Sequence, residues 1–187
     1  MVRLVYRLMG RSVKQLTGSE PARGSGIEPI EVWAHQPKMM SAMGKFQGAV
    51  RKGTSIDERL RMLIEAKGAQ MIGCEYCLDL GSQIARNSGF SDDELLALLR
   101  YRDSDLFTER EKVALDYTVA VMRTPVEVSD DLFAQLKEHF TDEQLVEITA
   151  MLMVTNLHRF NAAFDIGAAG FSDGRVCVPA ARAESLV

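Results

Sequence analysis

The sequence has few cysteines and no long apolar run. No stretch approaches the roughly 20 apolar residues of a membrane span, and the first residues lack the apolar segment and cleavage site of a signal peptide. We therefore expect a cytoplasmic protein with no membrane partner. Only three cysteines occur, Cys74, Cys77 and Cys177. In a reducing compartment, a close pair such as the first two is more often catalytic, redox-sensing or metal-binding than structural.

Acidic residues are absent from the start of the chain. Residues 1–19 carry Arg3, Arg7, Arg11 and Lys14 but no acid, which leaves 18 basic against 26 acidic side chains in the remainder. The remainder of the chain therefore has a formal net charge of −8, which argues against general nucleic-acid binding. The basic arm could contact an anionic membrane or another subunit, but a solvated or loosely docked arm is the commoner outcome.

No segment alternates convincingly with period two, so the sequence predicts an all-α fold. Apolar residues recur at helical spacing over residues 38–51, 56–72, 92–102, 109–123, 130–140 and 142–166, and another helix follows Cys74. Four runs open on a capping-box pair, namely Ser55/Glu58, Ser91/Glu94, Thr108/Glu111 and Thr141/Gln144, and Ser129 is a cap without a return partner. We expect an N-terminal arm and linker at 1–37, a helical domain at 38–170 and an irregular tail at 171–187.

The helical region contains an internal repeat. Residues 90–96 (FSDDELL) resemble residues 140–146 (FTDEQLV), fifty positions on. This predicts two related helix-pair units packed around one core. The positions fifty residues after Cys74 and Cys77 are Thr124 and Glu127, so any thiol chemistry is confined to the first unit.

The pair Cys74-Glu-Tyr-Cys77 follows Gly73 and stands near a helix N-terminus, where backbone N–H groups and the helix dipole favour a thiolate. Three interpretations are open. The cysteines could cycle between dithiol and disulfide, or they could be inert core residues. They could also be half of a zinc site, which ranks lower because a second closely spaced pair is missing and only Cys177, His139 and His158 remain to complete it.

Residues 60–80 (LRMLIEAKGAQMIGCEYCLDL) resemble the carboxymuconolactone decarboxylase-like superfamily, in its alkylhydroperoxidase D-like branch. The resemblance extends over about residues 38–170. It implies an all-helical bundle that assembles as trimers or hexamers, and dithiol peroxidase or disulfide-reductase activity. It also implies that Cys77 attacks a hydroperoxide, that Cys74 resolves the product, and that an unknown thiol reductant restores the pair. No cofactor and no metal are implied.

The match departs from the family pattern where a proton relay would lie. The family has a glutamate twelve residues before the first cysteine and a histidine four after the second, and these positions are Met62 and Gly81 here. Glu65, three residues after Met62, is the first candidate for a replacement base. His158 is a second, distal candidate, within a polar run from Asn156 to Asn161 that either lines a pocket or, as we favour slightly, forms a subunit contact.

The sequence therefore predicts an oligomeric dithiol oxidoreductase that reduces hydroperoxides, with Cys77, Cys74, Glu65 and His158 at its site. Two further functions stay open. One is a lactone decarboxylase of the same fold, which would not need the thiols. The second is a non-enzymatic oligomer that binds or senses redox state.

Overall fold

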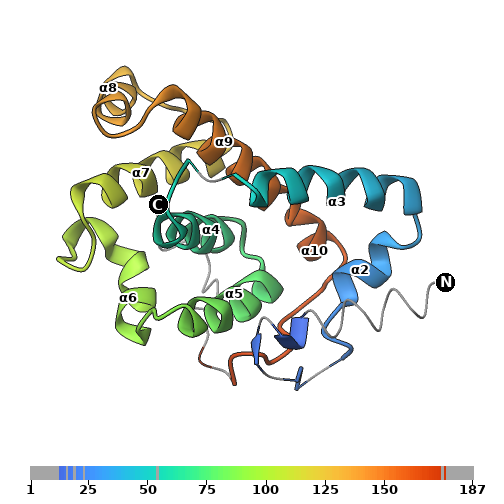
Figure 1. The fold of residues 1–187 in the computed structure, drawn as a ribbon. Coiled ribbons are helices and arrows are strands. Elements are labelled where there is room, and N and C mark those ends of the chain that lie inside the picture. Colours follow the sequence, from blue (N-terminus) through green and yellow to red (C-terminus); the bar gives the residue numbers. More distant parts are fainter. Residues whose placement is uncertain are drawn as a thin grey trace.

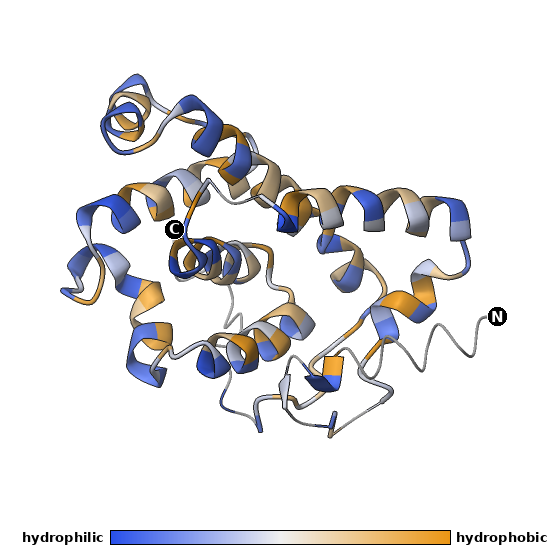
Figure 2. Cartoon of the chain, in the orientation of Figure 1, coloured by the Kyte–Doolittle hydropathy of each residue, from blue (hydrophilic) through white to orange (hydrophobic). Residues whose placement is uncertain are grey.

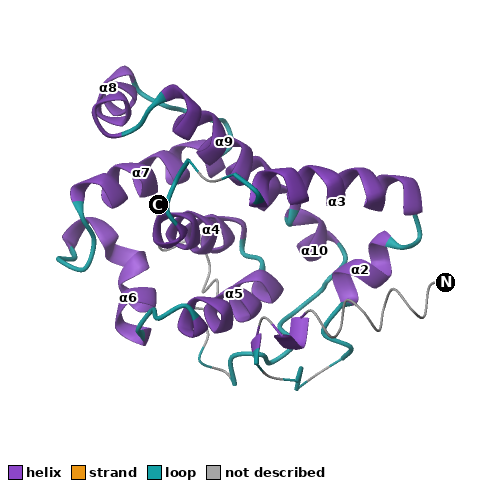
Figure 3. Cartoon of the chain, viewed as in Figure 1, coloured by secondary structure: helices purple, strands orange, loops and turns teal. Residues whose placement is uncertain are grey.

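The computed structural model describes residues 13–15, 17–18, 20–22, 24–53, 55–173 and 175. Within these ranges the chain forms helices joined by loops and turns, with no strand, which confirms the all-α prediction (Figure 3). Arg3, Arg7, Arg11 and Cys177 lie outside the described residues, so the predictions made for them stay predictions.

Helix α4 lies near the centre of the view in Figure 1 and packs against α5, α7 and α9. The element order is α2 (Glu28–Trp33), α3 (Pro37–Arg51), α4 (Glu58–Ile72), α5 (Glu75–Asn87), α6 (Asp92–Ala97), the 3₁₀ helix η1 (Leu98–Asp103), α7 (Glu109–Met122), α8 (Asp130–His139), α9 (Asp142–Leu157) and α10 (Arg159–Ala163).

Three sequence predictions need correction. The run 142–166 is not one helix, because α9 ends at Leu157 and the short α10 follows His158. The run 92–102 tightens into the 3₁₀ helix η1 after Ala97. The end of the predicted arm and linker at 1–37 is helical, because it forms α2, whose Trp33 stacks on Phe160 of α10 with ring centroids 4.1 Å apart.

Three of the four capping boxes are confirmed, at the starts of α6, α7 and α9. The box predicted from Ser55 is wrong. Asp57 caps α4 instead, its carboxylate accepting from Leu60 N–H at 2.8 Å. Ser55 donates its N–H and hydroxyl to Glu147 of α9, at 2.9 and 2.5 Å. The serine therefore joins two helices that are distant in sequence, a contact that local spacing does not reveal.

The repeat appears in the packing as a matched pair of arginines. Arg59 lies over the ring of Phe90 at 5.1 Å, and Arg110 lies over the ring of Phe140 at 4.7 Å. Arg59 of α4 forms an ion pair with Glu111 in the first turn of α7. Arg110 of α7 forms an ion pair with Asp57, the N-cap residue of α4. This exchange across α4 and α7 supports the interpretation of two related units packed around one core.

Several large apolar side chains remain exposed outside the core. Figure 2 shows hydrophobic and hydrophilic residues alternating along α3. The exposed apolar residues on α3 and α9 and directly after α10 are Met39, Phe46, Val146, Met153, Leu157 and Phe164. The predicted trimer or hexamer stays a prediction. Within the described residues, no helix combines the length and apolar character needed to cross a membrane.

Gly68 of α4 packs closely against Thr155 of α9. A Cβ atom added at Gly68 would lie 2.8 Å from Thr155 Cγ2, closer than real atoms pack. Thr155 is buried, and its hydroxyl donates to Met151 O at 3.0 Å, so its side chain is held in place. The helix contact therefore depends on a residue without a side chain at this position.

We predict that Gly68→Ala destabilises the protein, although alanine is the better helix former by about 1 kcal/mol. The overlap with Thr155 should cost about 1–3 kcal/mol, measured by chemical denaturation. Thr155→Ser removes the obstructing methyl and should restore stability to Gly68→Ala in a double-mutant cycle.

The matched control is Gly81→Ala in α5, where an added Cβ meets nothing within 4 Å. This variant should gain about 0.5–1 kcal/mol, because only the helix propensity changes. Equal effects of the two substitutions would contradict the proposed contact.

Candidate redox site

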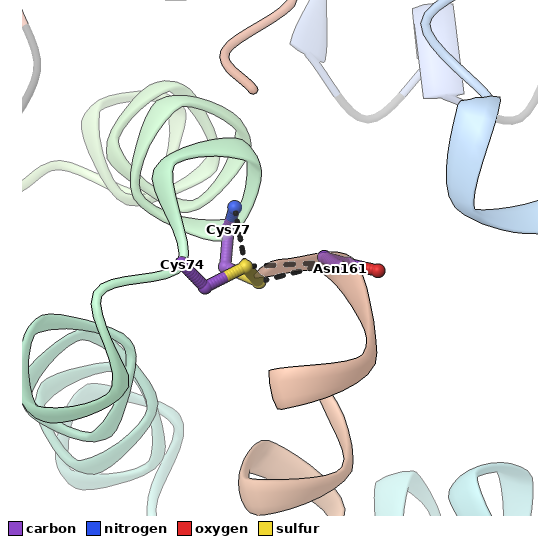
Figure 4. Close-up of a disulfide and its surroundings, with 3 residues drawn as sticks. All are labelled: Cys74, Cys77 and Asn161. Carbon is purple, nitrogen blue, oxygen red and sulfur yellow. Dashed lines mark hydrogen bonds between the residues drawn. A yellow bond between two sulfur atoms is a disulfide. The ribbon is translucent and has the colours of Figure 1, made fainter. Parts of the chain in front are cut away.

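The cysteine pair lies at a sharp junction between two helices. Gly73 ends α4 in the left-handed conformation, with φ 67°, and Cys74 is the N-cap residue of α5. A residue with a side chain adopts this conformation at a cost, which explains a glycine immediately before the pair. The first turn of α5 then brings Cys77 back beside Cys74, and the two form a disulfide (Figure 4). The predicted redox pair is therefore assembled.

The two sulfur atoms have different surroundings. Cys77 N–H donates to Cys74 Sγ at 3.2 Å, so Cys74 caps α5 through its sulfur. Cys74 is only 1% exposed and lies in an apolar cluster with Tyr76, Ala169 and Phe171. Cys77 is half-buried. An incoming molecule can therefore reach Cys77 more easily than Cys74.

Asn161 of α10 contacts both sulfurs. Its amide nitrogen donates to Cys74 Sγ at 3.4 Å and to Cys77 Sγ at 3.6 Å, and the residue is buried (Figure 4). The sequence places Asn161 in a polar run that either lines a pocket or, as slightly favoured, forms a subunit contact. The structure brings its side chain to the disulfide, and a subunit contact of the run stays a prediction. The available signal was the polarity of residues 156–161 in a region otherwise rich in Met, Leu and Phe, but nothing local connected it with residue 74.

Asp79 fixes the segment that covers the pair. Its two carboxylate oxygens accept hydrogen bonds from the N–H groups of Gly170, Phe171 and Ser172 and from the Ser172 hydroxyl, at 2.6 to 3.0 Å. Asp79 is fully buried, and Phe171 packs in the same cluster as Cys74. The carboxylate therefore holds the chain after α10 against α5.

The hydroxyl of Tyr76, between the cysteines, donates to Gly26 O at 2.7 Å, and its ring meets Phe171 edge-on at 6.3 Å. Burial raises the pKa of its phenol, which stays protonated. Tyr76 therefore ties the segment before α2 to the redox helix.

Glu65 lies on the face of α4 that leads to the pair. Ile72, two helical turns further on, shares this face and packs against the cluster that contains Cys74. The Glu65 side chain is exposed to water on one side, yet neighbouring protein desolvates the carboxyl and raises its pKa. Arg51 and Arg61 oppose that increase electrostatically. Within the described residues, Glu65 makes no hydrogen bond with either cysteine.

His158 lies between α9 and α10, three residues before Asn161. Desolvation lowers the pKa of its half-buried imidazole, so the ring is neutral at pH 7. A neutral imidazole can accept a proton. No hydrogen bond of its ring to another described residue is present, so its predicted catalytic role stays a prediction.

The two positions where the family pattern carries its relay differ in surroundings. Met62 lines a pocket of about 150 Å³ together with Phe90 and Arg59. The turn that follows α5 also lines this pocket. Gly81 has open space where a side chain would be. Among the described residues, no group of three or more His, Cys, Asp and Glu is placed to hold a metal ion.

Comparison with known proteins places this geometry in a family. The model of the carboxymuconolactone decarboxylase family matches residues 37–120. The uncharacterized protein YnjA of Escherichia coli (strain K12) is 39% identical over 150 residues, which cover 79% of this chain and 82% of that protein. The chain belongs to the carboxymuconolactone decarboxylase family.

Solved structures share the fold. A putative antioxidant defence protein AhpD from Agrobacterium tumefaciens is 25% identical with a TM-score of 0.69, over 73% of this chain and 94% of that one. The debrominase Bmp8 is 23% identical with a TM-score of 0.76, over 91% and 89% of the two chains. The protein is therefore a carboxymuconolactone decarboxylase-family member of the alkylhydroperoxidase D-like branch, as the resemblance implied.

We predict that Asp79→Asn lowers the free energy of unfolding by at least about 2 kcal/mol. The amide keeps one acceptor oxygen but turns an NH₂ group toward buried N–H donors, which lose their partner. Chemical denaturation measures the loss, and hydrogen exchange at residues 170–172 should quicken.

Glu75→Gln on the exposed face of the same helix is the control, with an expected change below about 1 kcal/mol. A cost for Asp79→Asn that does not exceed the cost for Glu75→Gln would show that the four contacts do not hold this segment.

Proposed function

We propose that the protein is a dithiol oxidoreductase that reduces hydroperoxides through Cys77 and Cys74. The observation that carries this proposal is the disulfide at the start of α5, in which Cys77 is half-buried, Cys74 is buried, and hydrogen-bond donors contact the sulfurs. An inert pair of core cysteines would not need donors directed at its sulfur atoms.

The proposed reaction starts from the reduced pair. The Cys77 thiolate attacks the terminal oxygen of the hydroperoxide, the O–O bond breaks, and the alkoxide takes a proton and leaves as an alcohol. The resulting sulfenic acid on Cys77 is attacked by Cys74, which forms the disulfide and releases water. A thiol reductant then returns two electrons and two protons to the pair.

Glu65 is the proposed base for the Cys77 thiol, because it lies on the α4 face that leads to the pair and its pKa is raised toward the working range of a base. A neutral His158 near Asn161 is the second group that could move a proton. Neither Glu65 nor His158 stands at the positions of the family glutamate and histidine, which are Met62 and Gly81 here.

One observation favours a second candidate. Trp33, Phe160 and Phe164 form an aromatic row, with centroids 4.1 and 4.5 Å apart, and Phe160 directly precedes Asn161. The debrominase Bmp8 was solved in complex with 2,3,4-tribromopyrrole. An aryl bromide and two protein thiols would give the arene, the disulfide and HBr. Lactone decarboxylation, and redox sensing without turnover, also stay open.

We predict that the reduced protein, in a Cys177→Ser background that removes the third thiol, consumes one equivalent of an organic hydroperoxide and loses two hydrogens in mass. Peptide mapping should place the new bond between Cys74 and Cys77. Cys77→Ser should abolish the reaction, whereas Cys74→Ser should stop at a sulfenic acid on Cys77 that dimedone traps.

A parallel anaerobic reaction with tribromopyrrole tests the second candidate, the reduction of an aryl bromide. A protein that stays reduced and leaves the peroxide intact would refute the peroxidase proposal. A lactone decarboxylase would keep its activity in both cysteine variants.

We predict that the rate of peroxide consumption falls as pH is lowered through the raised pKa of Glu65, because only the carboxylate can accept the thiol proton. Since that pKa lies above the ordinary 4.5, the loss begins at a higher pH than a surface glutamate would give. Glu65→Gln should remove this limb of the profile and lower the rate by roughly 10²-fold.

The control for Glu65→Gln is Glu58→Gln, seven residues earlier on the same face of α4 and 71% exposed at its side chain. That variant should keep the acidic limb but move it slightly to lower pH, because the charge of Glu58 contributes to the raised pKa of Glu65. An unchanged acidic limb in Glu65→Gln would assign the base to another residue.

A further inference from the structure

The hydrogen-bond donors around the disulfide favour one sulfur over the other. Cys74 Sγ accepts from Cys77 N–H at 3.2 Å and from the Asn161 amide at 3.4 Å. Cys77 Sγ accepts the longer of the two Asn161 bonds, at 3.6 Å. The residue whose sulfur has more donors, Cys74, is also the buried one, while Cys77 is half-buried and is the more accessible residue of the pair.

Breaking the disulfide strengthens the contacts at Cys74. A hydrogen bond to an ionised acceptor is roughly twice as strong as one between neutral groups. Burial opposes a thiolate by desolvating it, but the N-terminus of α5 and two aligned donors act in the other direction. In C-x-x-C motifs the donors win, and thiol pKa values of about 3.5–7.5 result.

We propose that Asn161 makes Cys74 the leaving thiolate when an external thiol reduces the disulfide at Cys77. The inference rests on the proposed dithiol chemistry, but it does not depend on a hydroperoxide being the substrate. Asn161 acts through the sulfur atoms, because its amide is the second donor at Cys74 Sγ, which already accepts from Cys77 N–H.

The exchange has two steps. The thiolate of the reductant attacks Cys77 Sγ, a mixed disulfide forms, the Cys74–Cys77 bond breaks, and its electron pair leaves on Cys74 Sγ. A second thiol of the reductant then attacks the reductant's own sulfur in the mixed disulfide. This releases Cys77 as a thiolate and the reductant as a disulfide. Exchange is faster when the leaving thiol has a lower pKa, so stabilising Cys74 speeds the first step.

Asn161 is well placed for this role because its position is fixed on both sides. Phe160, the preceding residue, stacks on Trp33 with centroids 4.1 Å apart. After α10, the backbone at residues 170–172 is bound by Asp79. Asn161 is itself 4% exposed, so water competes little for its amide. A neutral donor also stabilises the thiolate without forming an ion pair that would have to be broken on reoxidation.

The first test needs no variant of the site. The oxidised Cys177→Ser protein is mixed with limiting glutathione, quenched with N-ethylmaleimide and mapped by peptide mass spectrometry. Glutathione is expected on Cys77 and maleimide on Cys74. Glutathione found mainly on Cys74 would overturn the proposal, and peroxide plays no part in the result.

The second test measures the redox equilibrium with glutathione. Asn161→Ala should shift the equilibrium about tenfold toward the disulfide, roughly 30 mV, because the thiolate loses a donor. Asn161→Asp should shift it further, since a carboxylate repels the thiolate. Alkylation of Cys74 against pH, in a Cys77→Ser background, should show the thiol pKa rising in the same order.

Asn156→Ala is the matched control, since Asn156 accepts from Arg159 at 2.6 Å on the same stretch of chain. It should leave the equilibrium and the pH profile unchanged. If Asn161→Ala does not fold, Asn161→Ser replaces it and should also favour the disulfide. Equal equilibria for the Asn156 and Asn161 variants, or a smaller shift for Asn161→Asp than for Asn161→Ala, would overturn the role given to the amide.

Discussion

The buried carboxylate of Asp79 is the contact on which the arrangement of the site depends most. It lies two residues after Cys77 and accepts four hydrogen bonds from residues 170–172. Three of these four donors are backbone N–H groups, and the fourth is the Ser172 hydroxyl. The carboxylate therefore fixes the path of the main chain at residues 170–172. Phe171 is thereby held over Cys74, and the buried half of the disulfide is closed off from water.

The site is assembled from three parts of the chain that are far apart in sequence. The junction of α4 and α5 supplies the sulfurs, α10 supplies Asn161, and the segment before and within α2 supplies supports for both. Tyr76 is bound to Gly26 O, and Trp33 stacks on the residue before Asn161. A stretch that reads as linker in the sequence therefore helps to set the geometry at the disulfide.

Local patterns predicted the elements well, because caps and helical periodicity act within a few residues. The cysteine pair was also predictable, since C-x-x-C after a glycine is a local motif. What escaped prediction depends on contacts between distant residues. Ser55 pairs with Glu147 of α9 instead of capping α4. Lys67 is buried on α4, yet it donates to Leu98 O at 3.1 Å, and burial lowers its pKa to about 8. The position of Asn161 depends on the break between α9 and α10. The sequence predicted one continuous helix at 142–166 and did not indicate this break.

The two cysteines meet different demands, and the missing family relay affects them unequally. Met62 lines a pocket with Phe90, and Gly81 leaves open space, so neither supplies a base to Cys77. The donors at Cys74 do not depend on those two positions. In our proposal, thiol–disulfide exchange needs only a stabilised leaving thiolate, whereas peroxide attack by Cys77 relies on Glu65. In our proposal the two half-reactions depend on different residues, so a change that slows one half need not slow the other.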